Sequence, residues 1–262
     1  MIGTEPLQAL QVSTHGPVER NDLAYAKDKV SHLFRMAAGP VLHATVRLTQ
    51  EADPARERRA VAEATLDVDG RFARAHVSAP TMHEAVDLLE ARLRRRLLML
   101  AERAESKRLR HRGGREHEWR RGDARTHRPQ YYERPIDERE IVRRKSFELD
   151  ELTVDEAAFE MELLAHDFFL FSELATGVDS VVYRRRDGSF GLLQPAGTRA
   201  DLTACVASVH HGDRVAGNLT DAEAVELLDL TDDPFVFYVD EATGRGRVLY
   251  RRYDGHYGLV AC

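Results

Sequence analysis

The segment Val181–Leu193 reads VVYRRRDGSFGLL, and the segment Val248–Val260, 67 positions later, reads VLYRRYDGHYGLV. Agreement over so many positions indicates an internal duplication, which is the first feature to settle when a fold is inferred from sequence. The duplicated unit therefore decides the architecture of the C-terminal half of this chain.

Two further matches extend the duplication upstream. Leu152–Thr153 recurs as Leu219–Thr220 at the same offset of 67, and Asp167–Phe171 recurs as Asp233–Phe237 at an offset of 66. We therefore expect the two copies to differ by one residue lost and one regained. We assign residues 144–195 to copy 1 and residues 196–262 to copy 2.

Each copy is predicted to fold as helix, strand, turn, strand, strand. In copy 1, apolar residues follow helical spacing after Thr153, and Phe168–Phe171 is a short apolar run typical of a strand. Asp187–Gly188 and Asp254–Gly255 each separate two β-rich runs, where an Asp-Gly pair supplies the positive φ angles of a tight turn. The pattern predicts one β-hairpin in each copy.

A unit of about 40 residues without disulfides or metal buries too little apolar surface to fold alone. The second copy is covalently attached, so its effective concentration is on the order of millimolar or more. We expect a monomer in which the two copies pair within the chain as a pseudo-dimer. The residues expected to pair are Phe168, Phe169, Phe171, Val182 and Tyr183 with Phe235, Phe237, Leu249 and Tyr250, although some could belong to each copy's own core.

Whole-chain composition is that of a folded protein with two domains, at 262 residues and 43% hydrophobic content. No run of 18 apolar residues predicts a membrane span, and the first ten residues lack the pattern of a secretory signal, so we expect a cytoplasmic protein. Cys205 and Cys262 are the two cysteines, and we interpret them as reduced thiols, one in a core and one in the tail.

The net charge of −6 hides an uneven distribution. Residues 1–128 contain 24 Lys and Arg against 18 Asp and Glu, a net of +6, whereas residues 129–262 contain 14 against 26, a net of −12. A basic half favours binding to a polyanion by counterion release, and an acidic half is better suited to contacts with protein.

The first 105 residues are predicted to form an α+β domain in the order β-α-β-β-β-α. A strand at residues 7–13 precedes a helix with an apolar stripe, and residues 42–48, 62–68 and 73–78 alternate apolar and polar side chains as half-buried strands do. Thr81 and Glu84 fit a capping box at the start of a long last helix. This arrangement is shared with double-stranded-RNA-binding domains, although shape alone does not fix function.

Basic residues are dense from the middle of that last helix onward. Residues 92–128 contain 14 Lys and Arg against five Asp and Glu, which favours binding to RNA phosphates over a merely solvated surface. Residues 106–143 are predicted to be a flexible basic linker. The expected rRNA-binding residues are Arg20, Lys27, Lys29, Arg35, Arg74, Arg92, Arg94, Arg95, Arg96, Arg103, Lys107 and Arg108.

Two stretches carry a resemblance to a known family. Glu162–Phe171 (ELLAHDFFLF) together with Val181–Pro195 closely resembles the C-terminal domain of long-form ribosome hibernation promoting factors, and residues 7–100 resemble the family's N-terminal domain more loosely. The chain departs from the family in two ways. Leu98–Leu100 replaces part of the basic cluster that the family has at the end of the last helix. This chain also carries two C-terminal copies, whereas an ordinary long form carries one. The chain resembles a two-copy, actinobacterial dormancy-type version of the factor.

The resemblance implies a stress-response protein of the bacterial ribosome. In the family, the N-terminal domain lies in the decoding channel of the 30S subunit, in the place of messenger and transfer RNA, and the C-terminal domain homodimerises to join two ribosomes. The implied partners are 16S rRNA, small-subunit ribosomal proteins and the 70S ribosome. If the copies pair within the chain, the factor would hold single 70S particles; if they pair between chains, it would form 100S particles. The acidic copies could instead dock on a ribosomal protein.

Other classes of function have less support in the sequence. His210–His211, Asp213 and His166–Asp167 invite metal or acid-base interpretations, but no HExxH, CxxC or glycine-rich phosphate loop is present, so we predict no enzyme, metal site or cofactor. A regulator that binds DNA or RNA through the basic half is the alternative, although no helix-turn-helix or zinc motif accompanies it.

Overall fold

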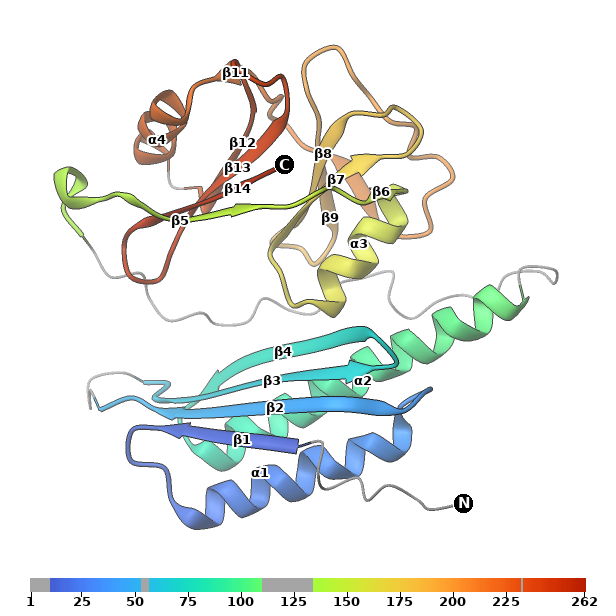
Figure 1. Cartoon of the computed structure of the whole chain (residues 1–262), viewed down its shortest axis with the longest axis vertical. Helices are drawn as coiled ribbons and strands as arrows, with labels where there is room; N and C mark the ends of the chain where they lie inside the picture. Colours follow the sequence, from blue (N-terminus) through green and yellow to red (C-terminus); the bar gives the residue numbers. More distant parts are fainter. Residues whose placement is uncertain (1–9, 53–56, 110–133, 232) are drawn as a thin grey trace. The chain divides into compact units, whose positions relative to one another are not determined.

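The computed structural model describes residues 10–52, 57–109, 134–231 and 233–262. It divides the chain into an N-terminal domain, which runs from β1 to α2, and a C-terminal unit, which runs from η4 to β14. Figure 1 shows both and labels most of their helices and strands. Each of the two parts has sheets and buried residues of its own.

The N-terminal domain has the predicted β-α-β-β-β-α order. Its sheet order is β1-β2-β3-β4, with β1 parallel to β2 and the other pairs antiparallel. Its elements are β1 (Leu10–His15), α1 (Arg20–Leu33), the 3-10 helix η2 (Phe34–Met36), β2 (Val41–Gln50), β3 (Ala60–Val68), β4 (Arg71–Ala79) and α2 (Met82–Leu109). The expected α+β fold class is confirmed.

One face of this sheet is apolar and is covered by the two helices α1 and α2 (Figure 1). Most of the alternating strand residues predicted to face inward are buried, among them Val46, Leu66 and Ala75, but Leu42 at the start of β2 is 57% exposed. Leu89 and Leu93 of α2 are fully buried. Burying large aliphatic side chains on α2 against alternate strand positions contributes about 1.5–3 kcal/mol for each fully buried residue. The opposite face of the sheet is open and polar.

Aspartate–glycine pairs form turns in both parts, but by two geometries. Between β3 and β4, both Asp69 (φ 53°) and Gly70 (φ 81°) have positive φ, as in a two-residue turn of type I′. In the copy hairpins, among the described residues, only Gly188 (φ 83°) and Gly255 (φ 81°) of the corresponding pairs do. There the aspartate accepts from the backbone instead, and Asp187 Oδ1 lies 2.9 Å from the amide nitrogen of Ser189.

The C-terminal unit contains two five-stranded sheets, one for each copy, with strand orders β10-β9-β8-β7-β6 and β11-β12-β13-β14-β5. Each copy provides helix, strand, strand and strand in the predicted order. Copy 1 contains β6 (Glu151–Leu152), α3 (Val154–Leu163), β7 (Phe168–Glu173), β8 (Asp179–Arg184) and β9 (Phe190–Leu193). Copy 2 contains β11 (Asn218–Leu219), α4 (Asp221–Leu230), β12 (Phe235–Asp240), β13 (Gly246–Arg251) and β14 (Tyr257–Ala261).

The strand registers correct the expected alignment of the copies. Phe168 pairs with Tyr183 in copy 1 and Phe235 pairs with Tyr250 in copy 2, so β7 and β12 correspond at an offset of 67. The offset of 66 for Asp167–Phe171, with its lost and regained residue, is therefore wrong. The shared Asp at the start of each apolar run suggested that offset, whereas the strand ladders fix the pairing through backbone hydrogen bonds.

Each copy's sheet is completed by a strand that lies N-terminal to the helix of the other copy. β5 (Ile141–Ser146) precedes α3 of copy 1 and pairs parallel with β14 of copy 2, and β10 (Val209–His211) precedes α4 of copy 2 and pairs parallel with β9 of copy 1. The open edges of β14 and β9 are thus covered, as exposed strand edges require. This reciprocal exchange ties the two copies together through backbone hydrogen bonds as well as side chains.

The structure differs from the expected linker at both of its ends. The helix α2 continues to Leu109, and the far end contains the 3-10 helix η4 (Ile136–Glu138) and the first residues of β5. The open edge of β14 needs a partner strand, which explains why residues from Ile141 form a strand despite their charge. Residues 110–133 lie outside the described part of the chain.

Candidate nucleic-acid surface and copy interface

Four aromatic rings meet where the two C-terminal sheets face each other. The ring centroids of Phe168 and Phe235 are 4.9 Å apart, and the rings of Phe168 and Tyr250 (5.6 Å) and of Tyr183 and Phe235 (5.8 Å) make the two reciprocal contacts. Phe168 and Phe235 hold the same position in the two copies, as do Tyr183 and Tyr250. Such reciprocity is that of an isologous dimer, here within one chain.

Apolar residues from both sheets surround these rings and complete the copy interface. Equivalent positions of the two copies contribute in pairs, so the cluster spans the contact rather than belonging to one copy. Its buried members are Leu149, Leu170, Val181, Ala216, Phe237, Val248 and Val260, and Phe168, Leu193, Phe235, Val239, Tyr250 and Cys262 pack against them. The structure therefore has the two copies packed as a pseudo-dimer inside one chain.

The residues expected to pair fall on two faces of their strands. Phe168, Tyr183, Phe235, Phe237 and Tyr250 are brought together in the copy interface. Phe169, Phe171, Val182 and Leu249 do not belong to that cluster, and Leu249 packs with α4 in the core of copy 2. Adjacent strand residues point to opposite faces, so a run such as FFLF supplies the interface and the copy's own core alternately.

A buried carboxylate lies at one end of the copy interface. Asp179 of β8 accepts hydrogen bonds from Arg245 Nε (2.8 Å) and Arg245 Nη2 (3.2 Å) and from the backbone amide of Gly246 (2.7 Å). Burial alone would raise the pKa of the Asp179 carboxyl, but these donors outweigh it and the net effect is a lowered pKa. Asp179 is thus held ionised at neutral pH by residues of copy 2.

The two cysteines are free thiols. Cys262 borders the copy interface, with its Sγ 3.6 Å from Asp179 Oδ2, and Cys205 lies in the loop before β10. Burial raises the pKa of the Cys205 thiol to about 11 and also raises that of Cys262. Both are therefore protonated and weakly reactive at neutral pH.

In the N-terminal domain, Lys29, one of the expected rRNA-binding residues, forms an ion pair that links α1 to α2. Lys29 Nζ of α1 lies 2.9 Å from Asp87 Oδ1 of α2, and the hydroxyl of Tyr25 donates to the same carboxylate at 2.6 Å. The hydrogen bond to Asp87 raises the pKa of Lys29, and that from Tyr25 lowers the pKa of Asp87. Lys29 thus has a structural partner in place.

Three arginines of α2 are also engaged within the domain. Arg92 Nη1 donates to the backbone carbonyl of His76 (3.3 Å), Arg96 Nη1 donates to that of Arg74, and Arg94 pairs with Glu90. Four helical residues advance about 6.0 Å and two strand residues about 6.6 Å, so Arg92 and Arg96 match successive carbonyls along β4. The two arginines thus cover the unpaired edge of β4. The sequence analysis did not predict this structural role.

Other expected cations are exposed. Arg20, Lys27, Arg35 and Arg74 form no ion pair with any residue that the structure describes. Arg20 and Lys27 lie seven residues apart on the outer side of α1, whereas Arg74 lies on the open face of the sheet beside Thr65. Arg95 and Arg103 lie in α2 and have partners, and the side chains of Lys107 and Arg108 are outside the described set. The predicted residues thus do not form one patch.

The sheet carries two exposed cations that were not among the expected RNA-binding residues. Arg47 of β2 lies on the open face, in the row Ser13, Arg47, Glu63 and His76 across the four strands. Its outward position in the alternating strand pattern was the available signal. Arg71 is exposed at the start of β4, but it pairs with the buried Val68 and shares the face of Ala73 and Ala75. The side chain of Phe72 is 51% exposed at the same end of the sheet, which adds an aromatic surface.

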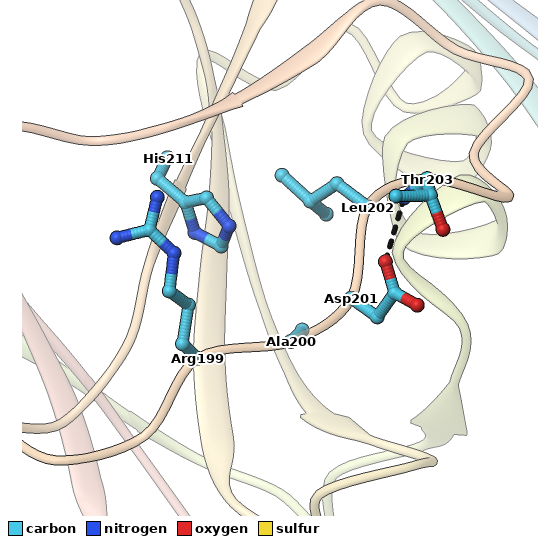
Figure 2. A pocket seen from close by; sticks show the side chains of 6 residues that line it. All are labelled: Arg199, Ala200, Asp201, Leu202, Thr203 and His211. Carbon is cyan, nitrogen blue, oxygen red and sulfur yellow. Dashed lines mark hydrogen bonds between the residues drawn. The ribbon is translucent and has the colours of Figure 1, made fainter.

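A hollow lies at the outer edge of the copy 1 sheet (Figure 2). His211 of the edge strand β10 lines it, and burial together with the nearby charge of Arg199 lowers the pKa of the His211 imidazole. The remaining lining residues are Ala200, Asp201, Leu202 and Thr203, and the Thr203 amide donates to Asp201 Oδ1 at 2.9 Å. His210 is exposed, so the adjacent histidines do not converge on one ligand.

Membrane-spanning helices and metal clusters are both absent from the described residues. No helix in this part of the chain is long and apolar enough to cross a bilayer. Over the same residues, no three His, Cys, Asp or Glu side chains gather in the manner of a metal site.

Two family models that carry related descriptions match the two parts of the chain. The family model "Sigma 54 modulation protein / S30EA ribosomal protein" matches residues 14–105, and "Sigma 54 modulation/S30EA ribosomal protein C terminus" matches residues 137–192 and 212–259. The chain belongs to the long-form ribosome hibernation promoting factor family. The C-terminal family model covers most of both copies, in agreement with the duplication.

Curated relatives of this family member come from Mycobacterium tuberculosis. A protein named "Dormancy associated translation inhibitor" from strain H37Rv is 34% identical over 134 residues, and its counterpart from strain CDC 1551 / Oshkosh matches equally. Each alignment covers 46% of this chain and 46% of the relative. The chain is thus aligned with about half the length of these relatives.

Two solved structures similar to the chain each cover about a third of it. The N-terminal domain of Thermus thermophilus Protein Y is 23% identical, with a TM-score of 0.26, over 33% of this chain and 96% of that one. A ribosomal subunit interface protein from Coxiella burnetii is 15% identical, with a TM-score of 0.29, over 36% and 97%.

Proposed function

We propose that this chain is a ribosome hibernation factor that inhibits translation during stress or dormancy. Its N-terminal domain would bind the decoding channel of the 30S subunit and block messenger and transfer RNA. Family membership and the name of the mycobacterial relatives support ribosome association and inhibition of translation. The partners would be 16S rRNA and small-subunit ribosomal proteins.

The packing of copy 1 on copy 2 carries the finer part of the proposal. The contact of Phe168 with Phe235 and the exchanged strands β5 and β10 occupy, inside one chain, the surface that a dimer between chains would need. Breaking it would expose the aromatic rings and two strand edges. The factor would therefore hold single 70S ribosomes, with the C-terminal unit unavailable to a second ribosome.

The charges of the N-terminal domain and of the C-terminal unit suit different binding partners. The exposed cations Arg20, Lys27, Arg35 and Arg74 suit RNA phosphates, whereas the strongly acidic C-terminal unit would be repelled by RNA. That unit suits a basic ribosomal protein instead. Binding would then weaken with salt, mainly through the N-terminal domain.

Sedimentation of ribosomes saturated with the full-length protein tests the proposal. We expect the protein to co-sediment with 70S particles and no 100S peak to appear. A dominant 100S peak would mean that the copies pair between chains, which is the alternative outcome. Inhibition of translation in a purified system supplies the second readout, because blocked messenger RNA must stop protein synthesis.

A parallel binding measurement separates this function from that of a DNA-binding regulator. Pulldown of 30S subunits and of duplex DNA at one salt concentration should favour the subunits strongly. Comparable binding to both would indicate general affinity for polyanions.

A further inference from the structure

Asp179 and Gly246 occupy the same position in the two copies and touch each other. Asp179 is the first residue of β8 and Gly246 the first residue of β13, 67 positions later. The Gly246 amide donates to Asp179 Oδ2 at 2.7 Å. A Cβ placed on Gly246 would lie 2.6 Å from the Asp179 Cβ, closer than two such atoms approach.

The residues next to this pair are also unlike. Arg245 of copy 2 supplies the guanidinium that binds the Asp179 carboxylate, and the equivalent position of copy 1 is Val178. A Cβ on Gly246 would also lie 3.0 Å from Phe237 Cε2, so Phe237 takes part of the space that a side chain there would need. The equivalent of Phe237 in copy 1 is the smaller Leu170, which leaves room for Asp179.

We propose that the copies are complementary halves, with a carboxylate, Val178 and Leu170 on copy 1 matched to a glycine, Arg245 and Phe237 on copy 2. Each copy therefore accepts the other kind and rejects its own kind at this contact. The inference deepens the proposed function, on whose intrachain pairing it rests, because it says which partner the copy interface selects.

Pairing of like with like would fail for a different reason in each case. Two copies of type 1 would bring two Asp179 side chains into the same space, with no guanidinium between them, and burial of unpaired like charges is costly. Two copies of type 2 would oppose two Arg245 side chains without a carboxylate and leave a gap between two glycines. Specificity of this kind uses repulsion against the wrong partner as well as attraction for the right one.

Three full-length variants test this selection. The first, F237L/R245V/G246D, makes copy 2 resemble copy 1, and the second, L170F/V178R/D179G, makes copy 1 resemble copy 2. The third combines all six substitutions and so exchanges the two halves. Gly217→Asp is the matched control, because Gly217 is exposed and nothing lies within 4 Å of a Cβ placed there.

Calorimetry of the C-terminal unfolding transition and light scattering are the readouts. We expect both like-with-like variants to lose several degrees in the unfolding midpoint and to stay free of stable dimers, whereas the exchanged variant recovers most of the loss and the control is unchanged. The inference is overturned if a like-with-like variant keeps the wild-type midpoint, if either dimerises tightly, or if the exchanged variant is no better than its two parents.

The ribosome experiment keeps the two proposals apart. Wild-type protein that yields 70S particles while the like-with-like variants stay fully stable would overturn only the selection between copies. Wild-type protein that yields 100S particles would overturn the proposed intrachain function, whatever the variants do.

Discussion

Phe168 and Phe235 lie with their ring centroids 4.9 Å apart, and each is the other's counterpart in the duplicated sequence. A residue that meets its own equivalent marks a local twofold relationship between the copies. One chain thus contains both halves of an interface between two copies of the same unit.

Removing either ring should weaken the pairing of the copies. Phe168→Ala and Phe235→Ala are each expected to lower the free energy of unfolding of the C-terminal unit by about 3 kcal/mol, near the low end for phenylalanine because both side chains are half-buried. Urea unfolding measures the loss. Tyr253→Ala is the control, since that side chain is 67% exposed, and equal losses at Tyr253 would count against the interface.

Two glycines opposite the interface tyrosines should resist substitution. A Cβ on Gly191 would lie 2.1 Å from Tyr183 Cζ, and one on Gly258 would lie 2.3 Å from Tyr250 Cζ. Gly191→Ala and Gly258→Ala must push each tyrosine out of the aromatic cluster, at a cost of roughly 1–3 kcal/mol. Thermal unfolding checks this against Gly217→Ala, and similar effects at all three glycines would contradict it.

Acid should loosen the copy interface through Asp179. Its pKa in the folded protein is lowered from the ordinary value of 3.8, so the stabilisation it provides is complete above about pH 4 and is lost as pH falls through the folded-state pKa. The difference in unfolding midpoint between the wild-type protein and Asp179→Asn should therefore shrink at lower pH. A difference that stays constant from pH 6 to pH 3 would show that ionisation of Asp179 is not coupled to folding.

Substitution of the arginines should separate structural cations from RNA-binding ones. R92A/R96A uncovers the backbone carbonyls at the edge of β4 and should lower the melting temperature of the N-terminal domain. R20A/K27A/R35A/R74A should leave the melting temperature nearly unchanged and reduce the salt slope of ribosome binding by about one for each phosphate that is no longer neutralised. If the quadruple variant binds with an unaltered slope, the footprint lies elsewhere, with Arg47 and Arg71 as the next residues to test.

Some features of the fold followed from local sequence patterns. Alternation of side chains identified the strands of the N-terminal domain, and the capping sequence at Thr81 identified the start of α2. The repeated Asp-Gly pairs identified the hairpins. These features are readable because turn geometry, capping and side-chain periodicity depend on residues only a few positions apart.

The roles of the candidate site residues were harder to predict from the sequence, because the environment of each side chain depends on partners far away in the chain. Lys29 and Arg94 looked available for RNA until Asp87 and Glu90 were placed beside them. Phe169 and Phe171 looked equivalent to Phe168, although only alternate residues of β7 face copy 2. The alignment offset of 66 failed for the same reason, because a backbone ladder and not a shared aspartate fixes the register.

The sequence by itself determined that this chain carries one basic α+β domain and two copies of a small acidic unit, because composition, periodicity and repetition are properties of the chain alone. Only the tertiary structure decided that β5 and β10 change places between the copies, and that Asp179 meets its own counterpart, Gly246. Those relationships join residues far apart in the chain. Their energies come from packing, edge pairing and burial of charge, which exist only once the distant segments are in contact.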